Sequence, residues 1–437
     1  MFHRPSIRVE TPHVDGNKVS FPFSCSESIR KYFQSFTLDV AYDMDIRDVP
    51  PSLLNVPIMG NLVTVAWAAG ADLHADTLDA TFLACLTPLR NVFQEMYPQL
   101  IKQHTIEVSE LVSNQGEGDQ YGLLFSGGID STCSYIKNRA KNPNLIMVRG
   151  TDPPWLVRKD WKLTEAAFWT TLKRIYGSFA AKENTEINFI DSNMRAFLDE
   201  DSLNRDFRYY ITKGNWWTDV HHGIALLGIT APLTYIKNIR HLYISSSGSP
   251  PDYARARPNA SRPWVTKHVA WANVTVSTEG YPMLRQEKIH KYLKPFIEEG
   301  AHSPFIRVCF DKYDDMNCSD CEKCHRTIMG LLVENIDPND VGFKVDPAYF
   351  ERLKETLINN IDVLHPRSWL RLKIMLPPPF PDLHNSRQFF EWLRTFDFSV
   401  EEKKKHPIIT LSPVFIRKYV PESIKRLVRR HVIKEQL

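Results

Sequence analysis

The chain has 437 residues, 43% of them hydrophobic, and its 54 basic and 51 acidic side chains leave a formal net charge of +3. This length predicts two or three folded units, and the near balance of charge argues against a nucleic-acid coat protein or a trap for acidic substrates. We find no apolar run long enough for a signal peptide, and no stretch of about 18 apolar residues that predicts a membrane span, so we expect a cytoplasmic, soluble protein.

Residues 1–117 are expected to form an N-terminal α+β module. Leu62–Trp67 is a short apolar run, and apolar residues recur at helical spacing over Asp76–Met96. The segment 113–120 is polar, contains glycine and has no apolar periodicity, so we interpret it as the linker that ends a separate module.

Residues 118–340 alternate between strand and helix patterns. Strands are predicted at 121–125, 144–148, 186–190 and 241–245, and helices over about 129–137, 164–180 and 222–236. This alternation predicts an α/β fold whose parallel sheet is wound with helices on both faces. Ligands of such sheets gather at the carboxyl ends of the strands.

Residues 341–437 are expected to be a helical C-terminal extension, interrupted by Pro377–Pro381. Its end, from Arg417 to Lys434, has the pattern of a basic amphipathic helix. This helix could contact RNA or an acidic partner, or its apolar face could simply dock on the protein. Nucleic acid therefore stays an open partner, and so does self-association.

The segment between the first predicted strand and its helix has the composition of a phosphate-binding loop. Its two glycines allow close backbone approach, its hydroxyl groups add hydrogen-bond donors, and the following helix N-terminus favours an anion. The Asp130 carboxylate suits the Mg²⁺ that accompanies ATP. The candidate nucleotide-binding residues are Ser126, Gly127, Gly128, Asp130, Ser131 and Thr132. A plain strand-to-helix turn with a serine cap is the alternative.

The same hexapeptide resembles the signature of the PP-loop ATP pyrophosphatases, and the chain lacks the Walker pattern of common ATPases. The resemblance implies that a substrate oxygen attacks the α-phosphate, that pyrophosphate leaves, and that a nucleophile then displaces AMP. Asp130, Ser131 and Arg285 are the expected catalytic residues. Arg285 would meet phosphates from the far side of the loop together with Lys288, although a solvated helix face is the alternative. We expect Asp130→Asn to keep the fold and to abolish AMP formation.

Four of the seven cysteines crowd into one short segment, as Cys309, Cys318, Cys321 and Cys324. In a cytoplasmic protein this spacing favours a metal over disulfides, and four thiolates form a closed, structural Zn²⁺ site. Redox disulfides and an iron–sulfur cluster are the alternatives, and His325 could replace one thiolate.

Together, the loop and the cysteine cluster resemble the QueC family of 7-cyano-7-deazaguanine synthases over about residues 121–335. The resemblance implies a 7-deazaguanine carboxylic acid as the small-molecule substrate, activated by ATP and aminated to an amide and then a nitrile. The base-recognition element of that family stands here as 251–255, with Asp252 and a displaced Arg255. Trp216 could stack on the purine-like ring, although a tryptophan more often fills a core.

The extra segments before the loop and after the cysteines resemble the longer QueC-like proteins of bacterial antiphage defence systems. They suggest a second function, in which the activated acyl group passes to an amine of a protein partner docked on residues 1–117. A tRNA-modifying enzyme and a module that senses ATP without turnover are further alternatives. Deleting residues 1–117 is expected to spare adenylate formation and to abolish modification of the partner.

Overall fold

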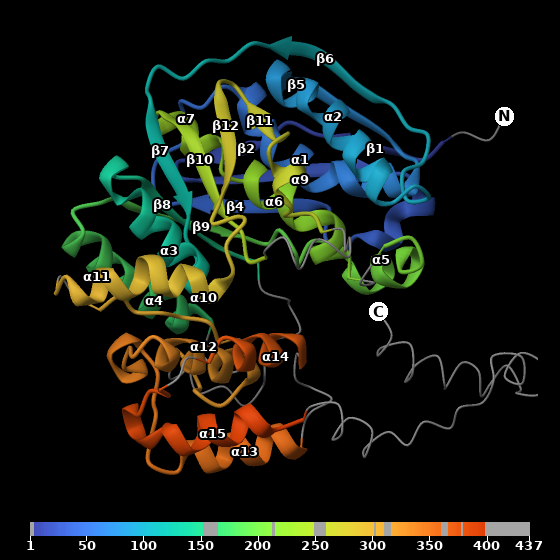
Figure 1. The fold of residues 1–437 in the computed structure, drawn as a ribbon. Helices are drawn as coiled ribbons and strands as arrows, with labels where there is room; N and C mark the ends of the chain where they lie inside the picture. The colour runs from blue at the N-terminus through green and yellow to red at the C-terminus, as the bar shows by residue number, and fades with distance from the viewer. Residues whose placement is uncertain are drawn as a thin grey trace, which may run out of the picture. The chain divides into compact units, whose positions relative to one another are not determined.

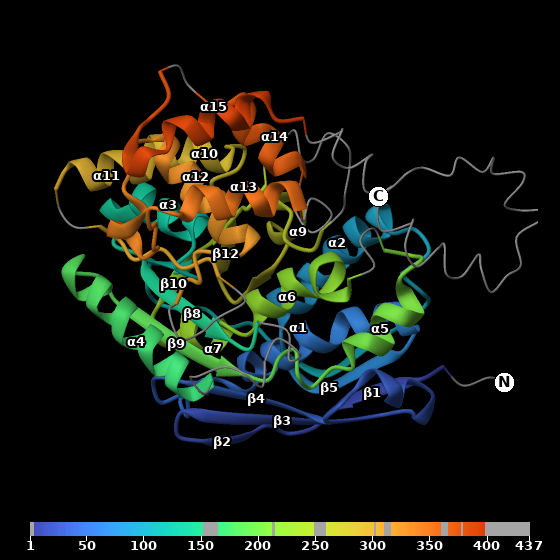
Figure 2. The same ribbon diagram turned by 90° about the horizontal axis from the view of Figure 1, so that it is seen from below.

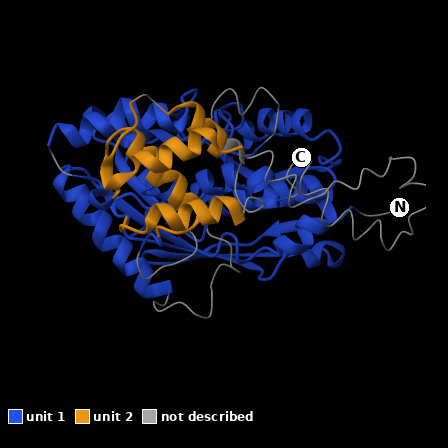
Figure 3. Ribbon diagram, turned by 60° about the horizontal axis from the view of Figure 1, so that its bottom comes forward, with its two compact units in different colours: residues 1–318, 339–343 blue, residues 319–338, 344–437 orange. Residues whose placement is uncertain are grey.

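The computed structural model describes residues 4–151, 165–211, 215–248, 259–300, 303–309, 316–359, 366–376 and 379–397. The chain divides into two compact units, residues 1–318 with 339–343 and residues 319–338 with 344–437 (Figure 3). Three predictions fall outside the described residues: the substrate residues Asp252 and Arg255, and the basic helix near the C-terminus.

The first unit is built on one mixed sheet, to which twelve strands of the described residues belong (Figure 1). The strands are β1 (Ser6–Val9), β2 (His13–Asp15), β3 (Lys18–Cys25), β4 (Thr37–Tyr42), β5 (Asp72–Asp79), β6 (Ile106–Val112), β7 (Gln120–Leu124), β8 (Asn144–Arg149), β9 (Ile187–Ser192), β10 (Ile239–Ser245), β11 (Ala270–Trp271) and β12 (Val274–Glu279). Their order is β11-β12-β10-β7-β8-β9-β4-β3-β1-β5-β6, and β2 pairs with β3.

Helices flank this sheet. In the first unit they are η1 (Glu27–Tyr32), α1 (Pro51–Ala69), α2 (Ala80–Met96), α3 (Ile129–Asn138), η2 (Arg139–Lys141), α4 (Glu165–Lys182), α5 (Glu200–Phe207), η4 (Trp217–His221), α6 (His222–Gly228), α7 (Ala231–Ile236), α9 (Pro263–Thr266), α10 (Arg285–Lys288), η5 (Ile289–Leu293) and α11 (Lys294–Glu298). The second unit is helical where it is described, with α12 (Glu322–Val333), α13 (Tyr349–Asn359), α14 (Pro366–Ile374), η8 (Leu383–Asn385) and α15 (Arg387–Thr395), and η6 spans Pro338–Val341.

The central strand β7 is the point at which the winding direction of the sheet reverses. The chain runs from β7 to β8 and β9 on one side, and it places β10 and β12 on the other side, with all of these neighbours parallel. The prediction of an α/β fold with a mostly parallel sheet is confirmed. In open sheets of this kind, the crevice outside the carboxyl ends at the reversal point is where ligands bind.

The N-terminal segment does not form a sheet of its own. Strand β4 pairs antiparallel with β9, and Ala41 lies opposite Asp191 in this pairing. The predicted boundary near residue 117 therefore does not separate two compact units, because residues on both sides of it belong to the first unit. The hydrophobic pattern of a strand does not identify the neighbouring strand that completes its hydrogen bonding.

Helix α1 is apolar on all sides. It has 19 residues with a mean hydropathy of 1.4 and is the one described helix long and apolar enough to cross a membrane, but 94% of that window is buried inside the protein. It packs against β5 and β1 (Figure 2). Length and composition alone are weak evidence for a membrane span, and this burial is that of a core helix.

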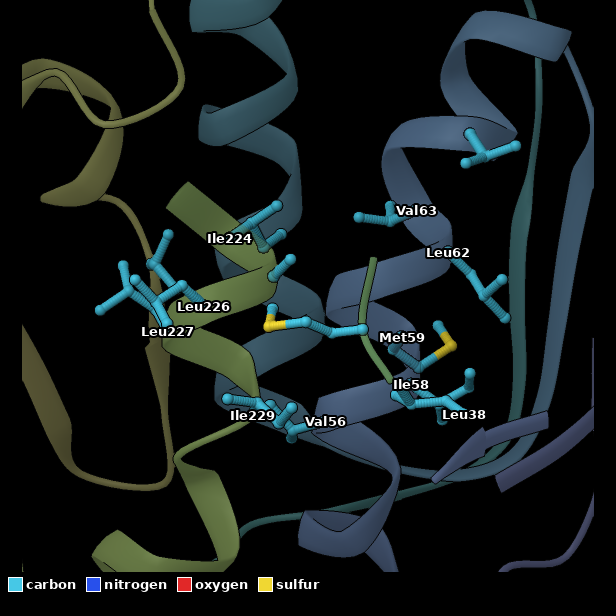
Figure 4. Close-up of a cluster of buried hydrophobic side chains, with 14 of the residues drawn as sticks. Leu38, Val56, Ile58, Met59, Leu62, Val63, Ile224, Leu226, Leu227 and Ile229 are labelled. Atoms are coloured by element: carbon cyan, nitrogen blue, oxygen red, sulfur yellow. The ribbon is translucent and has the colours of Figure 1, made fainter. Parts of the chain in front are cut away.

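Two glycines bring α1 into close contact with α6. A Cβ atom on Gly60 would lie 3.1 Å from the carbonyl oxygen of Ile224, and one on Gly228 would lie 3.3 Å from that of Val56. Figure 4 shows the side chains that surround this contact, among them Val56, Ile58, Met59, Leu62 and Val63 of α1 and Ile224, Leu226 and Leu227 of α6. The core thus joins helices from both sides of the predicted module boundary.

The predicted linker is fixed to the rest of the unit by hydrogen bonds. Asp79 is fully buried, accepts from the backbone N–H groups of Phe82 and Ala272, and accepts from the Asn114 amide. Gly116 exchanges two hydrogen bonds with the side chain of Asn273. Because buried polar groups are costly unless paired, this network holds 114–116 in one place.

We predict that Asp79→Ala lowers the free energy of unfolding by about 3 kcal/mol or more, because it removes a helix cap and leaves buried N–H donors without an acceptor. Urea unfolding measures the change. Asp45→Ala is the control, because Asp45 pairs with Arg47 at the surface, and it should change little.

We also predict that a protein lacking residues 1–117 is insoluble or unfolded. Removing these residues uncovers the edge of β9 and the face of α6 that contacts α1. A folded, monodisperse truncated protein would show that the shared sheet and core are dispensable. This outcome replaces the expectation, drawn from the sequence, that the truncation spares adenylate formation.

Candidate functional site

The loop predicted to bind phosphate lies at the carboxyl end of β7, where the winding direction of the sheet reverses. Gly127 has a φ angle of 73°, in the left-handed region that disfavours other residues. Gly128 is the N-cap residue of α3, and no side chain caps this helix. The sequence therefore builds the strand, tight turn and open helix N-terminus that an anion requires.

The two serines of the loop hold its shape. The Ser131 hydroxyl donates to the carbonyl oxygen of Gly128 at 3.1 Å and accepts from the N–H of Ser126 at 3.3 Å. The two serine hydroxyl oxygens lie 3.2 Å apart. Thr132 is buried, and its hydroxyl has no hydrogen-bond partner within the described part of the chain. All six residues predicted to bind the nucleotide thus lie together at the end of β7.

Asp130 is held between two cations of α10. Its Oδ2 atom lies 2.7 Å from Arg285 Nη2, and its Oδ1 atom lies 2.8 Å from Lys288 Nζ. The Asp130 side chain is 14% exposed, that of Arg285 32% and that of Lys288 only 2%. The structure therefore brings Asp130 together with two cations that lie 155 and 158 residues further along the chain.

Lys288 also connects the site to the next strand. Its ammonium group donates to the carbonyl oxygen of Ser246, which follows the end of β10. A buried ammonium is stable only when charge and hydrogen-bond partners surround it, and Asp130 and Ser246 supply both. Arg285 was the preferred cation from the sequence, yet Lys288 is the more deeply buried of the two. In the sequence, only the apolar neighbours Leu284 and Ile289 indicate that Lys288 points inward.

Electrostatics keep Asp130 ionised. Burial by itself would raise the pKa of Asp130, but the neighbouring charges of Arg285 and Lys288 outweigh it, so the pKa lies below its ordinary value of 3.8. The carboxylate is thus charged at neutral pH. The interaction with the two cations contributes stability above that ordinary value, and the contribution is lost as the pH falls through the lowered pKa.

The loop and the cations around it offer donors and positive charge to an anion. The helix N-terminus and the two α10 cations favour negative charge, and each oxygen of a carboxylate has a second lone pair that can face a hard cation such as Mg²⁺. The space that a side chain of Gly127 would need is occupied by the Tyr176 hydroxyl, and a Cβ atom on Gly128 would lie 3.5 Å from the carbonyl oxygen of Arg307. The donor set of the loop is therefore suited to a nucleotide phosphate with its metal ion.

Trp216 is not placed for stacking on a ligand. Its side chain is fully buried, and its ring packs on Phe207 with centroids 5.5 Å apart. The structure therefore corrects the interpretation of Trp216 as a substrate residue, because both faces of a buried ring are covered by protein. The adjacent Trp217 is also buried, and the guanidinium of Arg195 lies 4.6 Å from its ring centroid.

His221, the last residue of η4, and His222, the first residue of α6, are part of the core. The ring nitrogens of His221 lie 3.1 Å from Asn61 Oδ1 and 3.2 Å from Thr64 Oγ1. Burial and the positive charge of Arg195 lower the pKa of His221 to about 3 and that of His222 to about 4. Both rings are neutral at neutral pH, and His221 has both of its nitrogens occupied by the protein.

A groove of about 740 Å³ lies beside α10, and it does not coincide with the loop. Its lining residues are Pro282, Met283, Leu284, Glu287, His290, Lys291 and Pro295. None of the predicted phosphate-binding residues lines it. Loop geometry and charge therefore identify the candidate site better than the size of this concavity does.

The four clustered cysteines can hold one metal ion. Their sulfur atoms all lie within 4.8 Å of one another, with Cys309 and Cys324 buried and the other two half-buried. Four sulfurs at the zinc–thiolate distance of about 2.3 Å would lie roughly 3.8 Å apart, so a small contraction gives tetrahedral geometry. The seven cysteines are all described, and none forms a disulfide. The prediction of a four-cysteine metal site is thus supported, and zinc is consistent with it.

His325 is not needed as a ligand. Its Nδ1 atom lies 2.8 Å from the hydroxyl of Tyr349, within hydrogen-bonding distance. The four thiol groups complete the candidate set without it. His325 belongs to α12, its imidazole is buried, and Tyr349 is the first residue of α13.

Asn317 holds the first cysteine segment in position, a role that sequence reasoning missed. Its amide oxygen accepts from the N–H groups of Val308 at 3.0 Å and Cys309 at 3.3 Å. Its amide nitrogen donates to the carbonyl oxygens of Ile306 and Gly342. An asparagine beside a cysteine is common enough that its spacing alone carries no signal, and only the fold shows all four contacts.

We predict that Asp130→Asn destabilises the protein by about 3–5 kcal/mol, because it leaves the buried Lys288 ammonium without its counter-charge. The double variant Asp130→Asn/Lys288→Met should recover most of that loss. Arg285→Gln, at a partly exposed position, should cost about 1 kcal/mol or less. Denaturant unfolding of the four proteins checks this, and an Asp130→Asn protein as stable as the wild type would contradict it.

We predict about one zinc ion per chain, which Cys321→Ser loses together with much of the folding free energy, because a structural zinc stabilises the fold directly. Metal analysis of purified protein measures the first effect and thermal unfolding the second. Cys25→Ser is the matched control, since Cys25 is half-buried and lies outside the cluster. Equal zinc content in the Cys321→Ser protein and the control would rule out this site.

Comparison with known proteins gives no independent assignment. No protein-family model matches the chain, and neither a curated protein nor a solved structure matches it. The similarity to the QueC family therefore rests on the loop and the cysteine cluster, and the fold of the first unit stands as an α/β sheet with its candidate site at the reversal point.

Proposed function

We propose that the first unit binds MgATP at residues 126–132 and transfers AMP to a carboxylate, releasing pyrophosphate. The observation that carries the proposal is the Asp130 carboxylate held between Arg285 and Lys288 at the open N-terminus of α3. Three fixed charges and an uncapped helix converge there at the reversal point of the sheet. Such preorganised charge stabilises phosphoryl groups during transfer.

The source of the cations separates this site from the Walker class of ATPases. In the Walker class, the phosphate-binding lysine belongs to the loop itself, and this loop contains none. Here the cations come from α10, after β12, and approach the first turn of α3. This arrangement agrees with the PP-loop resemblance of the hexapeptide, in which ATP is divided between its α and β phosphates.

The proposed reaction begins when a carboxylate oxygen forms a bond to the α-phosphorus. The bond from that phosphorus to the oxygen bridging to the β-phosphate breaks, and its electron pair leaves with pyrophosphate. A nitrogen nucleophile then attacks the acyl carbon, AMP leaves with the electron pair of the acyl–oxygen bond, and a proton is released. With ammonia the product is an amide.

A nitrile requires a second ATP. The amide oxygen attacks the second α-phosphorus, pyrophosphate leaves again, and AMP departs with the oxygen as two protons are lost from nitrogen. Mg²⁺ bound with ATP would neutralise phosphate charge, and Asp130 is the residue that would face it. A zinc ion on the four cysteines would be structural, because four protein ligands leave no position for water.

The substrate we propose is a 7-deazaguanine carboxylic acid, on the strength of the QueC resemblance. Ammonia is the acceptor that this family suggests, and an amine of a protein partner is the second candidate. The proposal of a protein partner came from the extra residues 1–117, and the pairing of β4 with β9 makes these residues part of the same sheet as the candidate site. The defence-system resemblance of the longer family members remains its support, and mass spectrometry of co-expressed proteins separates the two acceptors.

We predict that the protein forms AMP and pyrophosphate from ATP with an acid substrate, and that Ser126→Ala slows this about a hundredfold by removing a loop donor. Chromatography of the nucleotide products measures the reaction. Ser20→Ala, on β3 and bonded to Asp39, is the control and should keep full activity. ADP and phosphate as products would refute the proposal.

A further inference from the structure

We infer that Tyr176 and Arg307 form a second wall of the phosphate loop and bind the pyrophosphate end of ATP. This assignment rests on the proposed function and extends it to residues that the loop motif does not contain. Tyr176 belongs to α4, and Arg307 belongs to the extended segment 303–309. The two residues approach Gly127, whereas Arg285 and Lys288 approach Asp130.

Tyr176 presents a buried hydroxyl to the loop. The side chain is 1% exposed, and within the described part of the chain its hydroxyl has no hydrogen-bond partner. A Cβ atom on Gly127 would lie 1.8 Å from that oxygen, so the hydroxyl stands directly against the loop backbone. Buried tyrosine hydroxyls normally have a partner, and a ligand oxygen at the loop would supply one.

The orientation of Tyr176 is set by its neighbours. Phe125, the last residue before the loop, packs edge-on at a centroid distance of 5.4 Å, and Phe305 packs edge-on at 6.4 Å. The phenol ring is therefore fixed from two sides, and its hydroxyl cannot turn to solvent without unpacking these rings. A rigid donor of this kind suits a developing negative charge.

Arg307 is hydrogen-bonded to the same glycine. Its backbone N–H donates to the carbonyl oxygen of Gly127 at 2.9 Å, and its guanidinium lies 4.7 Å from the ring centroid of Phe168. Phe168 and Tyr176 are both on α4, and Phe305, two residues before Arg307, packs on Tyr176. Burial raises the pKa of Tyr176 and the nearby charge of Arg307 opposes that rise, in keeping with their proximity.

The ligand that suits this wall is a polyphosphate. A guanidinium and a neutral phenol hydroxyl together offer donors to phosphate oxygens, and the planar guanidinium can hold two of them. A carboxylate substrate would need only one of these two groups, the guanidinium or the hydroxyl. Because Arg285 and Lys288 already face the first turn of α3, the Arg307 cation on the Gly127 side would add a second region of positive charge for a polyphosphate.

The test measures affinity for inorganic pyrophosphate with Mg²⁺, and separately for AMP, by calorimetry on the full-length protein. Tyr176→Phe removes only the hydroxyl and should weaken pyrophosphate binding at least about tenfold, without weakening AMP binding. Arg307→Met should do the same, and Arg307→Lys should restore only part of the affinity. The stability of Tyr176→Phe should equal or exceed that of the wild type, because a buried unpartnered hydroxyl is lost.

Tyr135→Phe is the matched control. Tyr135 is equally buried, but its hydroxyl donates to Glu183 at 2.9 Å, so its loss should lower stability and leave pyrophosphate binding unchanged. Wild-type affinity for pyrophosphate in both Tyr176→Phe and Arg307→Met would overturn the inference while leaving adenylation intact. A wild-type protein that binds MgATP without binding pyrophosphate would overturn it as well. Failure of the wild type to bind MgATP would instead refute the proposed function.

Discussion

The ion pairs of Asp130 with Arg285 and Lys288 connect the parts of the chain that make the candidate site. Asp130 lies in the first turn of α3, both cations lie on α10, and Lys288 also bonds the carbonyl of Ser246 at the end of β10. One buried carboxylate thus fixes a helix N-terminus, a distant helix and a strand end. Such a buried cluster costs desolvation energy and holds together only when every charge has a partner.

The cysteine segment supports the same loop from another direction. Arg307 bonds the Gly127 carbonyl through its backbone, and Cys309 follows two residues later. Asn317 then binds the backbone of Ile306, Val308 and Cys309, so this segment cannot shift freely. A metal ion on the four cysteines would tighten this support. The cysteine segment and the loop are therefore physically connected through Arg307.

The N-terminal segment contributes rigidity to the sheet that presents the loop. β4 extends the sheet beyond β9, the Gly60 and Gly228 contact joins α1 to α6, and Asp79 joins β5 to Ala272. These three connections join the described residues between 4 and 309 into one packed core. A site built on strands and helices that share one core holds its geometry better than one built between loosely linked modules.

The sequence by itself determined the local elements of the site. A strand, a tight turn and a helix N-terminus are predicted by the apolar run 121–125, the two glycines, and the serine and aspartate of the loop. The structure confirms all three, and each depends only on residues that are close in sequence. The spacing of the cysteines likewise predicted their convergence. Only the tertiary structure decided which cations face Asp130, that Trp216 lies in the core, and that Tyr176, Arg307 and Asn317 reach the site. These contacts join residues far apart in the chain, and side-chain burial and strand pairing depend on the packed neighbours that no local pattern specifies.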